Sequence, residues 1–127
     1  MMVRTILVVE DDLPLQYVIK FKLVKEGFAV IAVGSGEEAL QALKSQPSVL
    51  IWLDLFLPGM GGWRFLEMIR RSPQYKEVPV MIVSVLSDRE RIRKAFELNV
   101  VDYIVKSEND LGYAVGKVKQ YYERRGQ

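Results

Sequence analysis

Five short runs of apolar, mostly β-branched residues recur along the chain, and they constrain its fold more than any other feature. The runs cover residues 5–9, 28–33, 49–53, 78–83 and 100–105. Each run is nearly continuous rather than alternating with polar residues, which is typical of strands covered on both faces in a parallel sheet. The pattern therefore predicts five parallel strands.

Amphipathic segments separate these runs, and two of them show a helical repeat. Apolar residues share one face in each: Leu15, Val18, Ile19 and Leu23 in the first, and Leu111, Ala114, Val115 and Val118 in the last. Gly27 is expected to end the first helix. Because strand and helix alternate five times, we expect an α/β fold, a doubly wound five-stranded parallel sheet with five helices, similar to flavodoxin.

Two helix starts carry a recognisable capping pattern. Ser35 with Glu38, and Ser87 with Glu90, both fit the Ser-x-x-Glu capping box, in which the serine hydroxyl accepts a hydrogen bond from a backbone N–H of the first turn. We therefore expect Ser35 and Ser87 to cap the second and fourth helices.

Length and composition fit one compact domain over residues 1–127. The chain has 127 residues, half of them hydrophobic, and no repeat or linker; only the tail, residues 123–127, is expected to be loose. It contains no cysteine and no histidine, which argues against a disulfide framework and against the usual zinc sites. Because no stretch resembles a signal peptide or a membrane span, we expect a cytoplasmic protein that does not bind membranes.

The charge pattern argues against nucleic-acid binding. The net charge is only +2, and the 18 basic residues are spread along the chain rather than gathered in one stripe. No nucleic-acid partner is therefore expected for this domain alone.

Polar residues follow four of the five runs at the points where the strands are expected to end. They are Glu10, Asp11 and Asp12 after the first run, Asp54 after the third, Ser84 after the fourth and Lys106 after the fifth. In an open parallel sheet the carboxyl ends of the strands form one edge, where ligands bind. Carboxylates gathered there would repel one another without a cation, and hard oxygen ligands select Mg²⁺ or Ca²⁺. The sequence therefore predicts a metal site at this edge.

Taken singly, these residues also have structural explanations. Asp12 and Ser84 can each cap a helix, and Lys106 can be an ion-pair partner without a function. Glu10 and Asp54 fit such explanations less well, because each directly follows an apolar run where an unpaired charge is costly to bury. The functional interpretation therefore depends on the whole set.

Four motifs, in order, resemble the receiver domains of bacterial response regulators. They are ILVVEDD at 6–12, LDLFLPGMGG at 53–62, PVMIVS at 79–84 and DYIVK at 102–106. The resemblance extends over essentially the whole chain and implies the receiver topology. It also implies a phosphoacceptor that catalyses its own phosphorylation and dephosphorylation within a two-component phosphorelay.

The resemblance implies a role for each residue at the strand ends. Asp54 would take a phosphoryl group from a histidine kinase or phosphotransfer protein, and Lys106 would pair with the phosphate. Asp11, Asp54 and the backbone carbonyl of Phe56 would bind Mg²⁺, with Glu10 acting through water. These roles agree with the need to offset negative charge on the transferring group.

The resemblance also implies a switch. Ser84 would turn inward to bind a phosphoryl oxygen, and Tyr103 would follow it from an exposed to a buried position. Phosphorylation would then change the surface formed by the fourth helix, the fifth strand and the fifth helix, which a downstream target protein would recognise.

The chain departs from the family pattern at a few positions around this site. Ser107 replaces the usual proline after the lysine, and because a cis Lys106–Ser107 bond would cost about 3 kcal/mol, we expect a rebuilt loop. Gly61 stands where an acid or serine is usual, and we expect it to loosen that turn. Val85 is bulkier than the usual alanine or glycine, while Phe56 and Leu86 occupy two variable positions that affect dephosphorylation.

Three alternatives remain. The chain could be the receiver part of a longer regulator or hybrid kinase. It could be a phosphatase with Asp54 as nucleophile, although such enzymes commonly carry a second acid where Phe56 stands. A flavin carrier would need a phosphate-binding loop after the first strand, but residues 10–12 are acidic and would repel a phosphate.

A second apolar row lies on the first helix, beside its expected core face. It consists of Tyr17, Phe21 and Val24. The row is either ordinary packing at the edge of the core or a surface for a kinase or another partner.

Overall fold

The fold, described for residues 4–125 in a computed structural model, is a single parallel sheet with helices on both faces. The strands are β1 (Thr5–Val9), β2 (Ala29–Val33), β3 (Val49–Leu53), β4 (Val80–Ser84) and β5 (Asp102–Val105). All neighbouring strands pair in parallel, in the order β2-β1-β3-β4-β5. The predicted doubly wound, five-stranded α/β fold is therefore confirmed.

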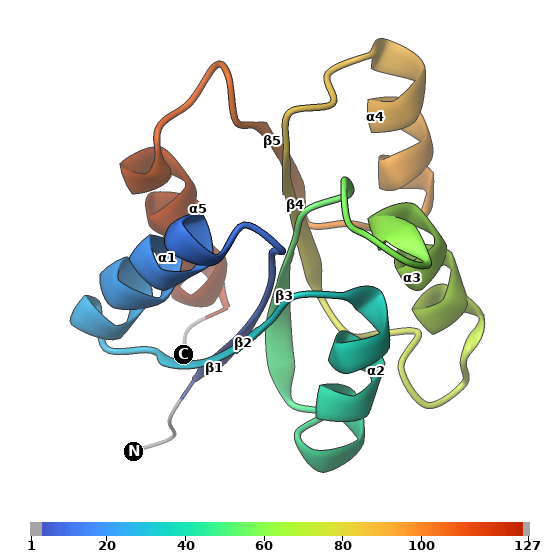
Figure 1. Cartoon of the computed structure of the whole chain (residues 1–127), viewed down its shortest axis with the longest axis horizontal. Coiled ribbons are helices and arrows are strands. Elements are labelled where there is room, and N and C mark those ends of the chain that lie inside the picture. The colour runs from blue at the N-terminus through green and yellow to red at the C-terminus, as the bar shows by residue number, and fades with distance from the viewer. Residues whose placement is uncertain (1–3, 126–127) are drawn as a thin grey trace.

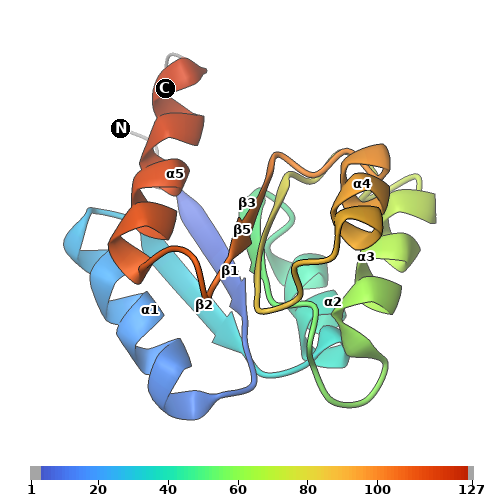
Figure 2. The same cartoon turned by 90° about the horizontal axis from the view of Figure 1, so that it is seen from above.

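The helices form two layers. They are α1 (Leu13–Lys25), α2 (Gly36–Ser45), α3 (Gly61–Arg71), α4 (Arg89–Glu97) and α5 (Leu111–Arg124). Figures 1 and 2 show α1 and α5 on one face of the sheet and α2, α3 and α4 on the other. The strand order reverses at β1, and open α/β sheets bind ligands beside such a reversal, at the carboxyl ends of the strands.

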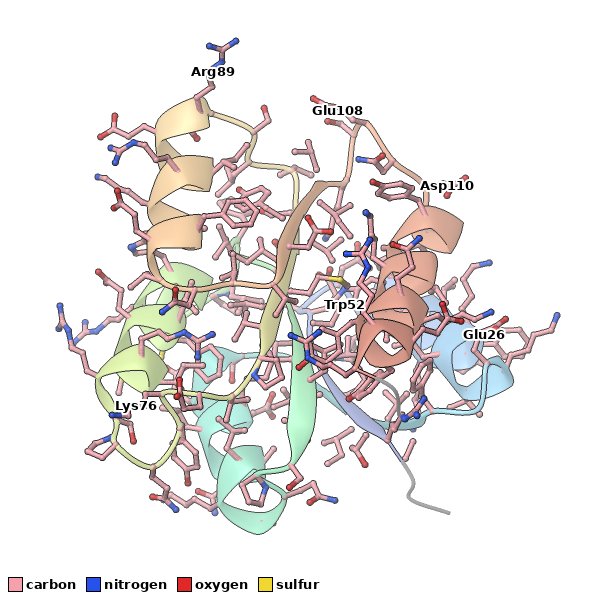
Figure 3. The ribbon with its side chains drawn as sticks, turned by 180° about the vertical axis from the view of Figure 1, so that it is seen from behind. Glu26, Trp52, Lys76, Arg89, Glu108 and Asp110 are labelled. Carbon is pink, nitrogen blue, oxygen red and sulfur yellow. The ribbon has the colours of Figure 1, made fainter. Side chains whose placement is uncertain are left out.

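Alternate side chains of the central strands build two separate cores. Toward α1 and α5, Val8 and Trp52 pack with the buried helix residues Ile19 and Leu23; Figure 3 shows Trp52 beside α5. The opposite core contains Leu7, Val9, Ile51, Leu53, Phe65 and Ile69. The strands β1, β3 and β4 are buried throughout, but β2 is only half-buried, because it lies at the edge of the sheet.

Three strands begin later than the sequence predicts. β2 begins at Ala29, because the N–H of Phe28 donates to Leu23 O at the end of α1, at 3.1 Å. β4 begins at Val80 rather than at residue 78, because Pro79 has no N–H to donate to a neighbouring strand. β5 begins at Asp102, two residues after the start of its apolar run.

The helix caps agree with the sequence at two sites and differ at one. Ser35 caps α2 by accepting a hydrogen bond from the N–H of Glu38, and Asp12 caps α1 through Leu15. The prediction that Ser87 caps the fourth helix is wrong. Asp88 caps α4 instead, its carboxylate accepting a hydrogen bond from the N–H of Arg91 at 3.2 Å.

The ends of the first and last helices also differ in part from expectation. Gly27 follows the C-cap of α1 with φ +97°, a conformation that favours glycine, so its predicted role is confirmed. Val18, however, is 39% exposed rather than part of the core. Residues 123 and 124 belong to α5 rather than to a loose tail; residues 126 and 127 lie outside the described part of the chain.

Candidate functional site

The carboxyl edge of the sheet brings together the polar residues that follow the strands. The ammonium of Lys106 lies 2.6 Å from Glu10 Oε1 and 3.0 Å from Asp54 Oδ2. These residues come from the ends of β1, β3 and β5, and they are far apart in the sequence. The expected convergence at this edge is therefore present in the fold.

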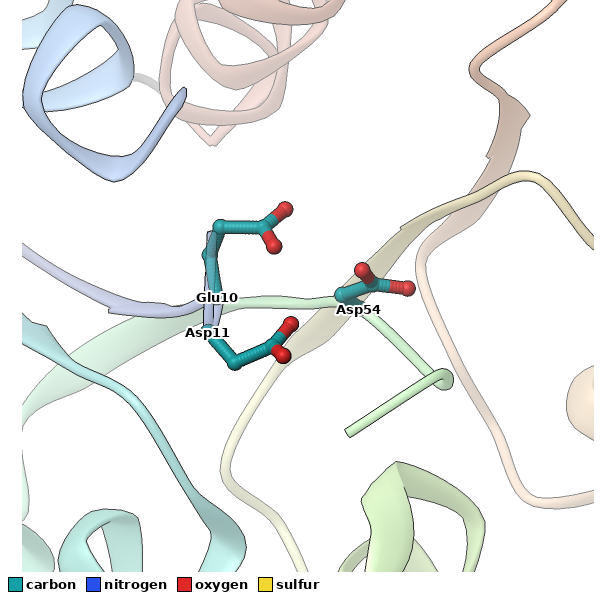
Figure 4. A group of neighbouring side chains, drawn as sticks. All are labelled: Glu10, Asp11 and Asp54. Atoms are coloured by element: carbon teal, nitrogen blue, oxygen red, sulfur yellow. The ribbon is translucent and has the colours of Figure 1, made fainter. Parts of the chain in front are cut away.

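Three carboxylates meet on this edge. Ligand oxygens of Glu10, Asp11 and Asp54 all lie within 4.8 Å of one another, and Figure 4 shows Asp11 extending toward Asp54. Glu10 and Asp54 are 1% and 5% exposed, whereas Asp11 is open to solvent. Backbone pairing sets their positions, because the N–H of Asp54 donates to Val9 O at 3.1 Å.

Burial and pairing change the acid–base properties of two of these groups. Burial raises the pKa of Glu10 above its usual value of 4.5, and the hydrogen bonds from Lys106 and the Asp12 N–H only partly oppose the rise. Burial alone would lower the pKa of Lys106, but the hydrogen bond to Glu10 and the charge of Asp54 raise it overall. Lys106 is therefore protonated at neutral pH.

The donor set fits a divalent cation. With all groups ionised, three carboxylates carry three negative charges and Lys106 carries one positive charge, so two negative charges remain uncompensated. Oxygen ligands with this charge suit Mg²⁺ or a similar hard cation. The carboxylates that would hold it are Glu10, Asp11 and Asp54.

The β3–α3 loop binds the carboxylate oxygen of Asp54 that Lys106 does not contact. The N–H of Phe56 donates to Asp54 Oδ1 at 3.0 Å, while the Phe56 side chain is 71% exposed. Gly62 must be a glycine, because a Cβ there would lie 2.6 Å from Leu55 Cα. Gly61 has φ +80°, so it supplies a conformation that the turn requires rather than only loosening the turn.

The two residues expected to form the switch bind the same peptide segment. The N–H of Leu86 donates to Ser84 Oγ at 3.3 Å, and the Tyr103 hydroxyl donates to Leu86 O at 2.5 Å. Ser84 is fully buried and Tyr103 is half-buried. Burial raises the pKa of Tyr103 above 10.0. Tyr103 is thus held by a hydrogen bond in a position between the exposed and buried ones that the resemblance implies.

The remaining departures from the family pattern also lie at this edge. Val85 and Leu86 directly follow Ser84 in the β4–α4 loop; Val85 is 53% exposed and Leu86 is half-buried. Among the peptide bonds of residues 4–125 none is cis, so the Lys106–Ser107 bond is trans. Asn109 closes this loop by donating from Nδ2 to Val105 O at 3.2 Å.

Two polar side chains at the ends of helices were not identified from the sequence. Gln16 of α1 donates to main-chain carbonyls at the ends of β1 and β2. Arg70 of α3 donates to four carbonyls, those of Lys76, Val78, Leu98 and Asn99. Their partners lie up to 29 positions away in the sequence, so no local pattern marks either residue.

Comparison with known proteins decides the family. The profile of the response regulator receiver domain matches residues 6–113. The chain belongs to the response regulator receiver family. The resemblance seen in its four motifs is thereby confirmed, and with it a place in two-component signal transduction.

A curated relative agrees with this assignment. The receiver domain is 31% identical over 105 residues to the phosphate regulon transcriptional regulatory protein PhoB of Escherichia coli (strain K12), covering 83% of this chain and 46% of PhoB. The receiver domain thus spans about half the length of such curated relatives.

Solved structures share its fold. The Francisella response regulator 1452 receiver domain superimposes with a TM-score of 0.86 at 25% identity, covering 96% of this chain and 98% of that one. The Mn²⁺-bound form of response regulator Rcp1 gives a TM-score of 0.79 at 27% identity, with 94% of each chain covered. Within residues 4–125 of the receiver domain, no helix is long and apolar enough to cross a membrane.

Proposed function

We propose that this receiver domain is a phosphoacceptor switch, in which Asp54 takes a phosphoryl group from a phosphohistidine of a histidine kinase or phosphotransfer protein. The observation that carries the proposal is the position of Asp54. Its carboxylate is nearly buried, lies 3.0 Å from the Lys106 ammonium and shares an oxygen cluster with Glu10 and Asp11.

The phosphoryl transfer is a simple substitution at phosphorus. A carboxylate oxygen of Asp54 forms the new O–P bond while the N–P bond of the phosphohistidine breaks, and the imidazole leaves with the electron pair and takes a proton from solvent. The Phe56 N–H holds Oδ1 and Lys106 contacts Oδ2, so both oxygens are oriented. Lys106 also offsets negative charge on the phosphoryl oxygens.

A magnesium ion fits this site, and Glu10, Asp11 and Asp54 would hold it, together with the main-chain carbonyl of Phe56. When bound, Mg²⁺ supplies positive charge that offsets the charge of the acids and of the incoming phosphoryl group. The manganese-bound form of the related Rcp1 supports a divalent cation in this fold.

The test of this function is the intact mass of the protein after incubation with acetyl phosphate and Mg²⁺. One added phosphoryl group is expected for the parent chain and none for Asp54→Asn. A phosphoryl mass that persists in Asp54→Asn, or that forms equally well in EDTA, would contradict the proposal.

Phosphorylation would act on the rest of the molecule through Ser84 and Tyr103. Because Ser84 Oγ accepts the N–H of Leu86, its own hydrogen remains free to donate to a phosphoryl oxygen. A shift of Ser84 would thus move the backbone of Leu86, whose carbonyl accepts the hydrogen bond from the Tyr103 hydroxyl. The surface of α4, β5 and α5, which would bind a downstream target protein, then changes with the phosphorylation state.

The phosphorylated form is expected to be long-lived for a receiver. Hydrolysis requires a water molecule in line with the bond between Asp54 and phosphorus, and placing that water contributes much of the rate. Phe56 and Leu86 cannot hydrogen-bond a water through their side chains, and Val85 adds bulk nearby. All three differences slow the loss of phosphate.

The decay of the phosphorylated protein in Mg²⁺ tests this expectation. The double variant Phe56→Asn with Leu86→Glu should lose its phosphate about tenfold faster than the parent chain, because positioned groups of this kind contribute at least that much. Equal decay rates would show that the placement of water is not limiting.

A longer regulator is the second candidate for the natural context of this domain. Its support is the observation that the chain covers 46% of PhoB, which is a transcriptional regulatory protein. In either context we place the domain in the cytoplasm, where it would meet its phosphodonor.

A further inference from the structure

Gln16 makes two hydrogen bonds that join the ends of two strands beside the acid cluster. Its Nε2 donates to Glu10 O at 2.8 Å and to Val33 O at 3.0 Å. Glu10 directly follows β1, and Val33 is the last residue of β2. The half-buried side chain of Gln16 thus connects the start of α1 to the carboxyl edge of the sheet.

The chemistry of the amide makes this arrangement specific. A primary amide has two N–H donors and one acceptor oxygen, and two carbonyl oxygens can be bound only by its amino group. Both donors are therefore used, and neither partner could be bound by a carboxylate or an apolar side chain. The main-chain N–H of Gln16 adds a third bond, to Asp12 O at 2.8 Å.

The bond to Glu10 O acts on the peptide unit between two of the candidate metal ligands. That peptide joins Glu10 to Asp11, so its orientation sets the direction in which the Asp11 carboxylate leaves the chain. Glu10 itself is held by Lys106 and by the Asp12 N–H, at 2.6 and 3.1 Å. Asp11 is exposed, and the bond from Gln16 restrains the peptide unit that carries it.

We propose that Gln16 is a positioning residue for the magnesium site: its amide fixes the Glu10–Asp11 peptide so that the Asp11 carboxylate faces Asp54. This inference rests on the proposed function, because it assigns Gln16 to the metal site of the phosphoacceptor. Groups that orient metal ligands by hydrogen bonds typically contribute about 10- to 100-fold to metal affinity.

A purely structural role for Gln16 predicts a different result. If its two bonds only attach α1 to the sheet, their loss lowers the free energy of unfolding and leaves Mg²⁺ affinity unchanged. Asn109 offers a matched control, because its amide also donates to a carbonyl at a strand end, Val105 O, at 3.2 Å. Asn109→Leu removes that bond on the β5 side of the edge.

The experiment compares Mg²⁺ dissociation constants, by isothermal titration with Mg²⁺ alone, for the parent chain, Gln16→Met and Asn109→Leu, together with their thermal midpoints. Methionine keeps the length of glutamine and its helix propensity but has no donor. Gln16→Met should bind Mg²⁺ about tenfold more weakly, and Asn109→Leu should stay within about twofold of the parent.

Two results would overturn the proposal: Gln16→Met binding Mg²⁺ as the parent does, or Asn109→Leu losing as much affinity as Gln16→Met. Should Gln16→Met not fold, Gln16→Glu takes its place. There the added charge alone would tighten Mg²⁺ binding, so weaker binding supports positioning and equal or tighter binding refutes it. If the parent chain binds no Mg²⁺, the proposed function fails first, and the role of Gln16 falls with it.

Discussion

The helices α1 and α4 both begin at the carboxyl edge of the sheet but are attached to the sheet in different ways. α1 buries Ile19 and Leu23 completely and still exposes a row of large apolar side chains on its outer face, Leu13, Tyr17, Phe21 and Val24. α4 has nine residues, of which only Ala95 is buried. Its surface carries three ion pairs between exposed side chains, which contribute little to stability.

From this difference in burial we expect α1 to be held more firmly than α4. Because Ile19 and Leu23 already attach α1 to the core, we expect the exposed apolar side chains on its outer face to be available to a partner. A helix that buries one small residue is held weakly, and elements that move in signalling come from the least stable parts of a fold. Figure 3 shows Arg89, at the start of α4, extending away from the body of the molecule.

The largest expected effect is on the free energy of unfolding, which we expect to depend more on the buried residues of α1 than on those of α4. Ile19→Ala should lower the free energy of unfolding by about 3 kcal/mol, because it opens a cavity in a fully buried site. Ile92→Ala on α4 should cost about 1 kcal/mol, because Ile92 is only half-buried. Urea unfolding of both variants measures the difference, and equal losses would show that α4 is attached as firmly as α1.

The next effect concerns the outer face of α1. Phe21→Ala should slow phosphotransfer from a histidine kinase about tenfold, as expected for an aromatic residue at the centre of a contact surface. Its stability should change by less than about 0.5 kcal/mol, since the ring is 60% exposed. Phe96→Ala on α4 is the control, because that ring is 47% exposed and α4 lies on the opposite face of the sheet from α1 (Figure 2).

Normal phosphotransfer in Phe21→Ala, accompanied by a large loss of thermal stability, would identify Phe21 as part of the core. Equal slowing in Phe96→Ala would remove the distinction between the two helices as docking surfaces.

The smallest effect concerns the link from the site to α4 through Tyr103. Burial raises the folded-state pKa of Tyr103 above 10.0, so the unfolded chain loses this proton first as pH rises. The stabilisation that the protonated Tyr103 hydroxyl contributes is fully present below pH 10, the pKa of the unfolded chain. It is lost as pH rises through the higher pKa of the folded state. Tyr103→Phe should cost about 1 kcal/mol at neutral pH, through loss of the bond to Leu86 O, and should lose less stability above pH 10.

Tyrosinate absorbance and urea unfolding across this pH range check both parts. If the parent chain and Tyr103→Phe lose stability in parallel above pH 10, the Tyr103 hydroxyl is not held as described.

The five strands and the acid cluster could be predicted because each depends on local chemistry. Continuous apolar runs identify buried parallel strands, and the polar residue that follows each run must lie at one edge of the sheet. Pro79 could have indicated the start of β4, but no residue marks the start of β5, which is set by pairing with β4. Ser87 and Asp88 are both good caps, and only the backbone at the start of α4 selects Asp88.

Gln16 and Arg70 could not be predicted for another reason. Each uses side-chain donors to bind main-chain carbonyls, and every residue has such a carbonyl. Sequence patterns record side-chain types and their spacing, so they cannot show which carbonyls lack a partner after the chain has folded. Long-range bonds of this kind become visible only in three dimensions.

The bonds of Arg70 have a mechanical consequence. Its Nε donates to Leu98 O at 2.6 Å and its Nη2 to Asn99 O, the two residues that follow α4, while Nη1 donates to Val78 O at 2.8 Å. The C-terminal end of α4 is thereby tied to α3 and to the segment that precedes β4. Its first turn carries no such tie to α3 among the described hydrogen bonds. If α4 moves while these bonds hold, we expect it to pivot about its C-terminal end. A helix of nine residues is about 13 Å long, so a tilt of about 15° displaces the first turn by about 3 Å while the last turn stays in place.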